Sequence, residues 1–199
     1  MASTKEFNRK IKTLKNTQKM TKTMKMVSAS KLRKAHQAQA NAKQYAEKLT
    51  DLINRISLSV ENTSHPLLTI HPQNNKILIL VFSSDRGLCG SFNNSLIKQV
   101  LNWLNENRSK YKQIDLSFCG KRGFMVLRRI GNLKKHYENV TANPKFSDAI
   151  KIGDELSSDF TKGEYGEIYI AYNQFFSPLS QKTIFEKMLR VSVCLLILL

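Results

Sequence analysis

Two short segments of the 199-residue sequence carry residue types that could bind phosphate. The loop Ser84–Gly90 reads Ser-Asp-Arg-Gly-Leu-Cys-Gly and follows an apolar run that predicts a buried strand. Glycine-rich loops between a strand and a helix are where α/β proteins cradle phosphates. The spacing fits neither GxxxxGK[ST] nor GxGxxG. Nucleotide binding is therefore the weaker interpretation, and a tight turn with glycines at positive φ is the stronger one. Gly120–Gly123 after a second predicted strand poses the same choice, and a solvated turn is again favoured.

The cysteines and histidines do not form a recognisable reactive or metal-binding pattern. Cys89 has no histidine near it in sequence that could activate a thiol, so we interpret it as a structural or incidental residue. The three cysteines are far apart, and the four histidines lack zinc spacing. The cysteine and histidine pattern predicts a reduced intracellular protein without a structural metal. We expect no residue of this sequence to be catalytic or to bind a cofactor.

The strongest chemical signal is positive charge. The formal net charge is +17, and residues 1–60 hold fourteen Lys and Arg residues against three acidic ones. Such a field predicts an acidic partner, which could be nucleic acid, anionic lipid or an acidic protein surface. The basic residues surround the predicted helix and aromatic residues are few in it, so a solvated face and an acidic protein partner are weighed equally. DNA or RNA binding is the alternative function.

The elements that position these residues divide the chain into four predicted segments. Residues 1–60 contain no Gly or Pro and predict one long helix, with Ser3 and Glu6 in a capping pattern at its start. Residues 61–75 have the composition of a linker, residues 76–190 predict an α/β domain, and residues 191–199 form an apolar tail too short to span a bilayer. Residues 1–26 lack the continuous apolar core of a secretory signal.

The predicted helix carries a narrow apolar seam with 4,3 spacing, which is typical of a coiled coil. One part of the seam is Phe7, Ile11 and Leu14, and a longer part runs from Ala38 to Ile56. The polar middle is interrupted by Met20, Met24 and Met26, which are either ordinary seam residues or an adaptable sliding contact. A helix of residues 4–58 would be roughly 80 Å long and would need a partner helix.

The second half of the chain alternates between strand and helix patterns, which predicts an α/β domain with a mainly parallel sheet. The predicted strands are 77–82, 114–118 and 168–172. The predicted helices are 96–104, 124–130 and 146–156, with Gly153 interrupting the last.

Three segments resemble signatures of one protein family. Asn16–Leu32 is similar to the N-terminal helix of ATP synthase gamma subunits. Ser84–Asn93 resembles a second signature of that family, with Ser91 where Gly is more usual, and Tyr172–Phe175 resembles the start of a third. The order and spacing of these segments agree with the family over roughly residues 1–180.

The resemblance implies a rotor subunit of an F-type ATP synthase that transmits torque and does not catalyse. It implies an antiparallel coiled coil of N- and C-terminal helices above an α/β foot domain. The implied partners are the alpha, beta and epsilon subunits and the membrane ring of c subunits, with no nucleic acid. The implied location is the cytoplasmic face of the bacterial inner membrane, as a peripheral protein.

The resemblance also implies which residues contact partners. Lys22 and Lys25 are expected to face acidic groups on beta, with Met20, Met24 and Met26 as apolar contacts. Asp85 and Arg86 are expected to contact neighbouring subunits. The family usually continues about ninety residues further and ends in the second long helix. The tail 191–199 does not resemble it, and we interpret the tail as a frameshift or premature stop that leaves the seam unpaired.

Overall fold

A computed structural model describes residues 3–59, 66–68, 74–177 and 180–188. The predicted tail 191–199 and most of the predicted linker 61–75 lie outside the described residues. The chain divides into two compact units, Met1–Tyr45 and Ala46–Leu199. One helix continues through the boundary between the two units.

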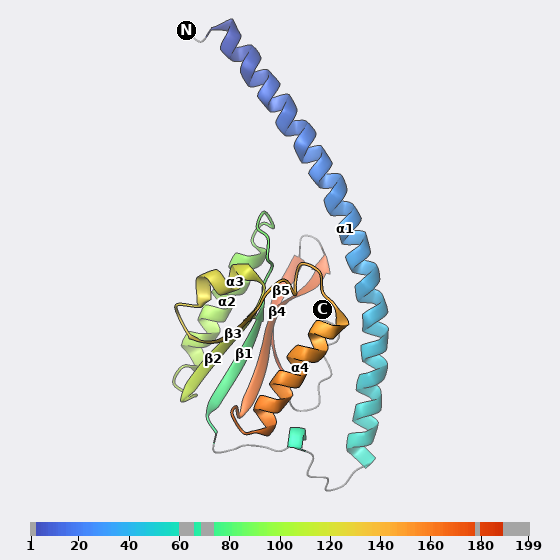
Figure 1. Cartoon of the computed structure of the whole chain (residues 1–199), viewed down its shortest axis with the longest axis vertical. Coiled ribbons are helices and arrows are strands. Elements are labelled where there is room, and N and C mark those ends of the chain that lie inside the picture. Colours follow the sequence, from blue (N-terminus) through green and yellow to red (C-terminus); the bar gives the residue numbers. More distant parts are fainter. Residues whose placement is uncertain (1–2, 60–65, 69–73, 178–179, 189–199) are drawn as a thin grey trace. The chain divides into compact units, whose positions relative to one another are not determined.

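The long N-terminal helix is confirmed. Helix α1 spans Thr4–Ser59 without interruption (Figure 1). Its first turn is capped as the sequence predicts: the Ser3 hydroxyl accepts a hydrogen bond from the Lys5 amide, and the Glu6 carboxylate accepts one from the Ser3 amide, both at 3.3 Å. The absence of Gly and Pro explains the continuity.

The rest of the described chain forms a foot domain around a five-stranded sheet with the order β3-β2-β1-β4-β5. The strands are β1 (Lys76–Phe82), β2 (Gln113–Cys119), β3 (Asn132–Tyr137), β4 (Glu167–Ser177) and β5 (Ser180–Lys187). The first four pair in parallel, and β5 pairs antiparallel with β4. The helices are α2 (Phe92–Asn107), α3 (Lys121–Leu127) and α4 (Phe146–Thr161), with a short 3₁₀ turn at Pro66–Leu68. The predicted mainly parallel α/β domain is therefore confirmed.

The sheet is buried on both faces. One core cluster contains Leu78 and Leu80 of β1 with Ile152 and Leu156 of α4, and Figure 1 shows α4 lying across the sheet. The alternate residues of β1 pack with α2 and α3 in a second cluster. This explains the unbroken apolar run that predicted β1, because both of its faces need apolar side chains.

Two strands were not predicted from the sequence, and one helix is displaced from its predicted position. The other predicted elements of the foot are present and extend beyond their predicted bounds. The short helix begins at Lys121 and ends at Leu127, three residues before its predicted start and end. β3 was missed because its sequence Asn-Leu-Lys-Lys-His-Tyr is polar, and four of its six residues are exposed at the edge of the sheet. β5 was missed because its first residues are polar and exposed, and only its pairing with β4 makes it a strand. Gly153 is accommodated inside α4.

Candidate partner-contact surfaces

The loop between β1 and α2 is held in one conformation by its own side chains. The Asn93 amide group, in the first turn of α2, accepts a hydrogen bond from the Ser84 amide at 3.1 Å and donates to Cys89 Sγ at 3.1 Å. The Ser84 hydroxyl donates to the Arg86 carbonyl at 2.6 Å. The loop is thus ordered by four residues within ten positions of the chain.

A carboxylate of the chain itself lies where a phosphate-binding loop would hold its anion. Asp85 accepts hydrogen bonds from the Lys121 amide at 3.0 Å and from the Thr141 hydroxyl at 2.8 Å. The Gly123 amide donates to Ser83 Oγ at 2.8 Å. The amides of Lys121 and Gly123 at the start of α3 are therefore already paired, which favours the turn interpretation for the Gly120–Gly123 segment.

The second glycine segment has a steric role. Gly120 has φ +96, and a Cβ there would lie 2.0 Å from the Ser83 carbonyl oxygen. Only glycine fits this approach of the β2–α3 turn to the end of β1. The turn brings Lys121 within reach of Asp85, so the two glycine segments found in the sequence form one structural unit at the carboxyl ends of β1 and β2.

The surface of this unit presents Leu88 and Arg86. The Leu88 side chain is 96% exposed, and its backbone has φ +61, a conformation that is costly for a residue with a Cβ. Arg86 is exposed, whereas Asp85 is half-buried and bonded inside the unit. Of the two sequence-predicted contact residues, Arg86 is therefore available to a partner, and Asp85 fixes the loop that carries it.

The two described cysteines differ in environment. Cys89 is exposed in the loop, and Cys119 is buried at the end of β2. Burial, helped by the negative charge of Asp85, raises the pKa of the Cys119 thiol far above its usual value. Cys119 therefore stays protonated and unreactive at neutral pH, as expected of a thiol in an apolar core.

The five sequence-predicted contact residues of α1 are all exposed, but helical geometry separates them into two faces. Met20 and Met24 are 64% and 48% exposed and lie one turn apart on the same face. Lys22, Lys25 and Met26 lie towards the opposite side of the helix. One flat partner surface therefore cannot contact both Met20 and Met24 and the two lysines. Only a partner that surrounds the helix can contact both sides.

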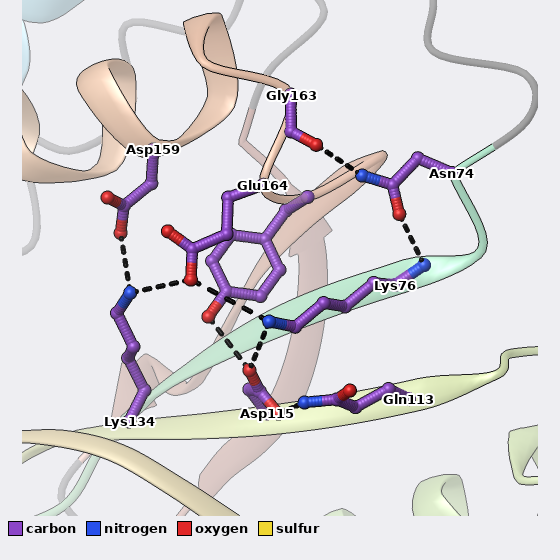
Figure 2. Close-up of polar contacts among 9 residues, drawn as sticks. Asn74, Lys76, Gln113, Asp115, Lys134, Asp159, Gly163 and Glu164 are labelled. Carbon is purple, nitrogen blue, oxygen red and sulfur yellow. Dashed lines mark hydrogen bonds and ion pairs between the residues drawn. The ribbon is translucent and has the colours of Figure 1, made fainter.

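Sequence reasoning missed a buried polar network at the amino ends of the strands (Figure 2). Asp115 of β2 is only 5% exposed. Its carboxylate accepts hydrogen bonds from Gln113 Nε2 at 2.7 Å and the Tyr165 hydroxyl at 2.9 Å, and it pairs with Lys76 Nζ at 3.2 Å. Burial by itself would raise the pKa of Asp115, but these donors outweigh it and hold the pKa below its usual value.

The network continues to the surface and fastens the segment before β1. Glu164 pairs with Lys134 Nζ at 2.8 Å and with Lys76 Nζ at 3.6 Å, and the hydrogen bond with Lys134 holds the pKa of Glu164 below its usual value. Asn74 donates to the Gly163 carbonyl at 2.5 Å and accepts from the Lys76 amide at 3.0 Å. Figure 2 shows these side chains converging between β1, β2 and the α4–β4 turn.

A signal for this network was present in the sequence. Asp115 and Ser117 alternate with Ile114, Leu116 and Phe118, so they occupy the second face of β2. Strand β2 lies between β3 and β1, and α4 covers the face of the sheet that carries Asp115 and Ser117. Both polar residues are therefore buried. A buried carboxylate needs hydrogen-bond donors, and the sequence alone does not show which residues provide them.

Within the described ranges, no helix is long and apolar enough to cross a membrane. The same ranges contain no group of three or more His, Cys, Asp or Glu side chains that could hold a metal ion.

Comparison with known proteins shows the family of the chain. A family model described as ATP synthase matches residues 3–194. The ATP synthase gamma chain of Geobacter sp. (strain M21) is 34% identical over 192 residues, which are 96% of this chain and 67% of the relative. The chain belongs to the ATP synthase gamma chain family. The gamma chain of Bdellovibrio bacteriovorus is 36% identical over 97% of this chain and 65% of the relative. The chain thus spans about two thirds of the length of these gamma chains.

Solved structures show the same fold. The central stalk and c-ring structure of the Tetrahymena thermophila mitochondrial ATP synthase contains a chain that is similar to this one with a TM-score of 0.62. The sequence identity is 23%, and the match covers 85% of this chain and 72% of the other. Family membership leaves the nucleic-acid interpretation of the basic helix without support.

Proposed function

We propose that this chain acts as a central-stalk rotor subunit of an F-type ATP synthase. In this role, it transmits rotation between a proton-driven membrane ring and the catalytic alpha and beta subunits. The observation that carries the proposal is membership of the gamma chain family together with the exposed helix α1. The chain has no catalytic site of its own in this proposal and needs no cofactor. Its foot contacts the epsilon subunit and the c-ring.

The helix suits a rod that turns inside a ring of subunits. The described residues 3–41 are all exposed, and α1 is about 80 Å long at 1.5 Å per residue. Lys22 and Lys25 on one side of the helix and Met20 and Met24 on the other let acidic and apolar parts of the surrounding alpha and beta subunits bind at once. The apolar seam would pair with a second helix as an antiparallel coiled coil.

The loop at the carboxyl end of β1 suits a contact at the foot. Its backbone is fixed by internal hydrogen bonds, and it exposes Arg86 and Leu88. A preorganised loop loses little conformational entropy on binding. We therefore assign the partner contact to Arg86, positioned by Asp85. Because the relatives are bacterial gamma chains, we place the assembly at the cytoplasmic face of the bacterial plasma membrane.

The test is a charge reversal in a full-length gamma chain whose residues 1–188 are those of this protein. The double change Lys22→Glu and Lys25→Glu should lower ATP synthesis driven by a proton gradient by about tenfold, since it reverses two contacts with acidic groups. ATP hydrolysis by the detached alpha, beta and gamma complex should fall less, because it does not require transmission of torque to the membrane ring.

The matched control is Lys31→Glu with Lys34→Glu, which changes the same charge at the same spacing on the same helix. Both pairs are exposed, so neither should alter the melting temperature of the foot. Unchanged coupling in the Lys22 and Lys25 double variant, or equal loss in the control, would contradict the contact assignment. Failure of the unaltered chimera to assemble with alpha and beta would contradict the rotor proposal itself.

A further inference from the structure

The edge of the foot formed by α3 and β3 carries exposed apolar side chains that the proposed function does not use. Met125 and Val126 of α3 are 52% and 48% exposed, and Ile130 in the following turn is 53% exposed. Leu133 of β3 is 47% exposed. Four large apolar side chains within nine residues are more than the scattered exposure that is ordinary on a protein surface. We call these four residues the α3–β3 patch.

Helix α3 and the Leu133 side chain of the α3–β3 patch lie on one face of the sheet. The Phe124 ring of α3 stacks on the His136 ring of β3 with centroids 4.2 Å apart, which places α3 over β3. Leu133 is paired in register with Leu116, whose side chain belongs to the core cluster under α2 and α3. Leu133 therefore points to the same side of the sheet as α3.

The charge around the α3–β3 patch is positive. Residues 116–137 contain six Lys and Arg residues and no acidic residue. Arg122, Arg128 and Arg129 are exposed on or beside α3. The guanidinium of Arg128 lies 5.3 Å from the centroid of the Phe124 ring, which holds it at the border of the patch. Arginine prefers carboxylates in bidentate geometry, so the surface fits an acidic partner.

The strand beside the α3–β3 patch has a free side. Among the residues that the structure describes, β3 is the last strand of the sheet and pairs only with β2. Lysines often protect such an edge from other strands. Here a bulge at Lys134 turns Lys134 and Lys135 towards α4, where Lys134 pairs with Glu164 and Lys135 with Glu155 at 2.5 Å. Both lysines are thereby tied on the α4 side of the strand.

We propose that the α3–β3 patch, with Arg128 and Arg129, docks an extended acidic polypeptide segment that adds a strand to the free side of β3. The peptide groups of the segment pair with β3, its apolar side chains cover Ile130 and Leu133, and its carboxylates meet the arginines. Strand addition favours a polypeptide over an anionic membrane, because lipid cannot pair with a strand edge. This surface shares no residue with the contacts of the proposed rotor function, so each can fail without the other.

The test uses the whole chain and three probes. The first is the capped peptide (Glu-Val)₄, the second is the same peptide with its two central valines replaced by proline, and the third is a phosphatidylglycerol vesicle. Hydrogen exchange should show protection of amides in residues 132–137 with the first peptide only. The proline peptide keeps the charge but cannot form a ladder. Its binding should be weaker by about tenfold or more, since it loses main-chain pairing.

Charge variants test the arginines. Arg128→Glu with Arg129→Glu should weaken binding of (Glu-Val)₄ by about tenfold or more, because attraction becomes repulsion. The control, Lys98→Glu with Arg108→Glu, makes the same change at an exposed position of α2 and at the exposed residue that follows it. It should leave affinity within about twofold, because neither residue belongs to the α3–β3 patch and exposed charges are screened. Near-ultraviolet circular dichroism checks that both variants are folded. If the Arg128 and Arg129 variant is unfolded, Arg129→Glu by itself replaces it.

Three results would overturn the proposal. One is equal affinity for the valine and proline peptides, which would show that charge alone binds them without strand pairing. Another is vesicle binding that depends on Arg128 and Arg129 without peptide binding, which would make it a lipid surface. The third is the absence of protection in residues 132–137 at saturating peptide.

Discussion

The two compact units of this chain differ in how far their apolar side chains are exposed to solvent. In the helical unit, Phe7, Ile11 and Leu14 are between 48% and 68% exposed, and the described residues 3–41 include no buried one. In the foot, Ile77, Leu78, Ile79, Leu80 and Val81 of β1 are all 0% exposed. Both units contain patterned apolar residues, but within the part of the chain that the structure describes only the sheet has elements packed on both faces.

The contrast between the two units locates the folding free energy in the foot. Burial of apolar side chains contributes about 25 cal/mol per Å², so an exposed seam contributes little. A single helix in water is only marginally stable, whereas a packed sheet domain unfolds cooperatively. The helical unit therefore has little folding free energy of its own, and the foot is the part that folds around a core.

Hydrogen exchange should separate the two units by the largest margin. Amides of residues 5–35 should exchange at least about a thousandfold faster than those of β1, because local opening of a solvated helix costs little and opening of β1 requires global unfolding. Mass spectrometry on dilute, intact chain measures both regions in one sample. Strong protection of residues 5–35 that does not change with protein concentration would show that the two units do not differ in this way.

Equivalent truncations should have unequal effects. Leu80→Ala removes a side chain that is 0% exposed and should lower the free energy of unfolding by about 2–5 kcal/mol. Leu14→Ala removes one that is 68% exposed and should change the free energy of unfolding by less than about 0.5 kcal/mol. Urea denaturation followed by Trp103 fluorescence measures both. Similar losses in the two variants would show that the helical seam is buried in solution.

The buried network should give the foot a pH dependence that the helical unit lacks. Because Asp115 has a lowered pKa in the folded foot, its contribution to stability is present above its unfolded pKa of about 4 and is lost as pH falls through the folded value. Asp115→Asn should cost about 1–3 kcal/mol at pH 7 and make stability less dependent on pH below about 4. Denaturation between pH 2.5 and 7 measures this, with the exposed Glu106→Gln as control. A pH profile identical to that of the unaltered chain would contradict the assignment.

The smallest effects are expected in the loop at the end of β1. Leu88 and Gly90 have nearly the same φ, +61 and +60, and a Cβ added at Gly90 would meet nothing within 4 Å. Leu88→Gly should stabilise the foot by up to about 1 kcal/mol by removing the steric cost of this conformation, and Gly90→Ala should destabilise it by a similar amount. Melting temperatures of the two variants should move in opposite directions. Movement in the same direction would show that backbone strain does not control this loop.

The amino-acid sequence was sufficient to predict the elements whose signal is local. The lack of Gly and Pro with a capping pair at Ser3 and Glu6 predicted α1, and a run of apolar residues predicted β1. Two long motifs in register, with the start of a third, indicated the family, which the comparisons confirm. These features depend on propensity and spacing, which a sequence displays directly. The contact roles of Met20, Lys22, Met24, Lys25, Met26, Asp85 and Arg86 stay predictions.

Features that depend on distant neighbours became visible only in the folded chain. β3 and β5 are polar at many positions and become strands because β2 and β4 supply hydrogen-bonding partners. Asp115 is acceptable in a buried strand because Tyr165, fifty residues later, donates to it. Asp85 accepts a hydrogen bond from the first turn of α3 because Gly120 allows the carboxyl ends of β1 and β2 to approach each other closely. Hydrogen bonds between residues far apart in sequence leave no periodic pattern, so the fold alone reveals them.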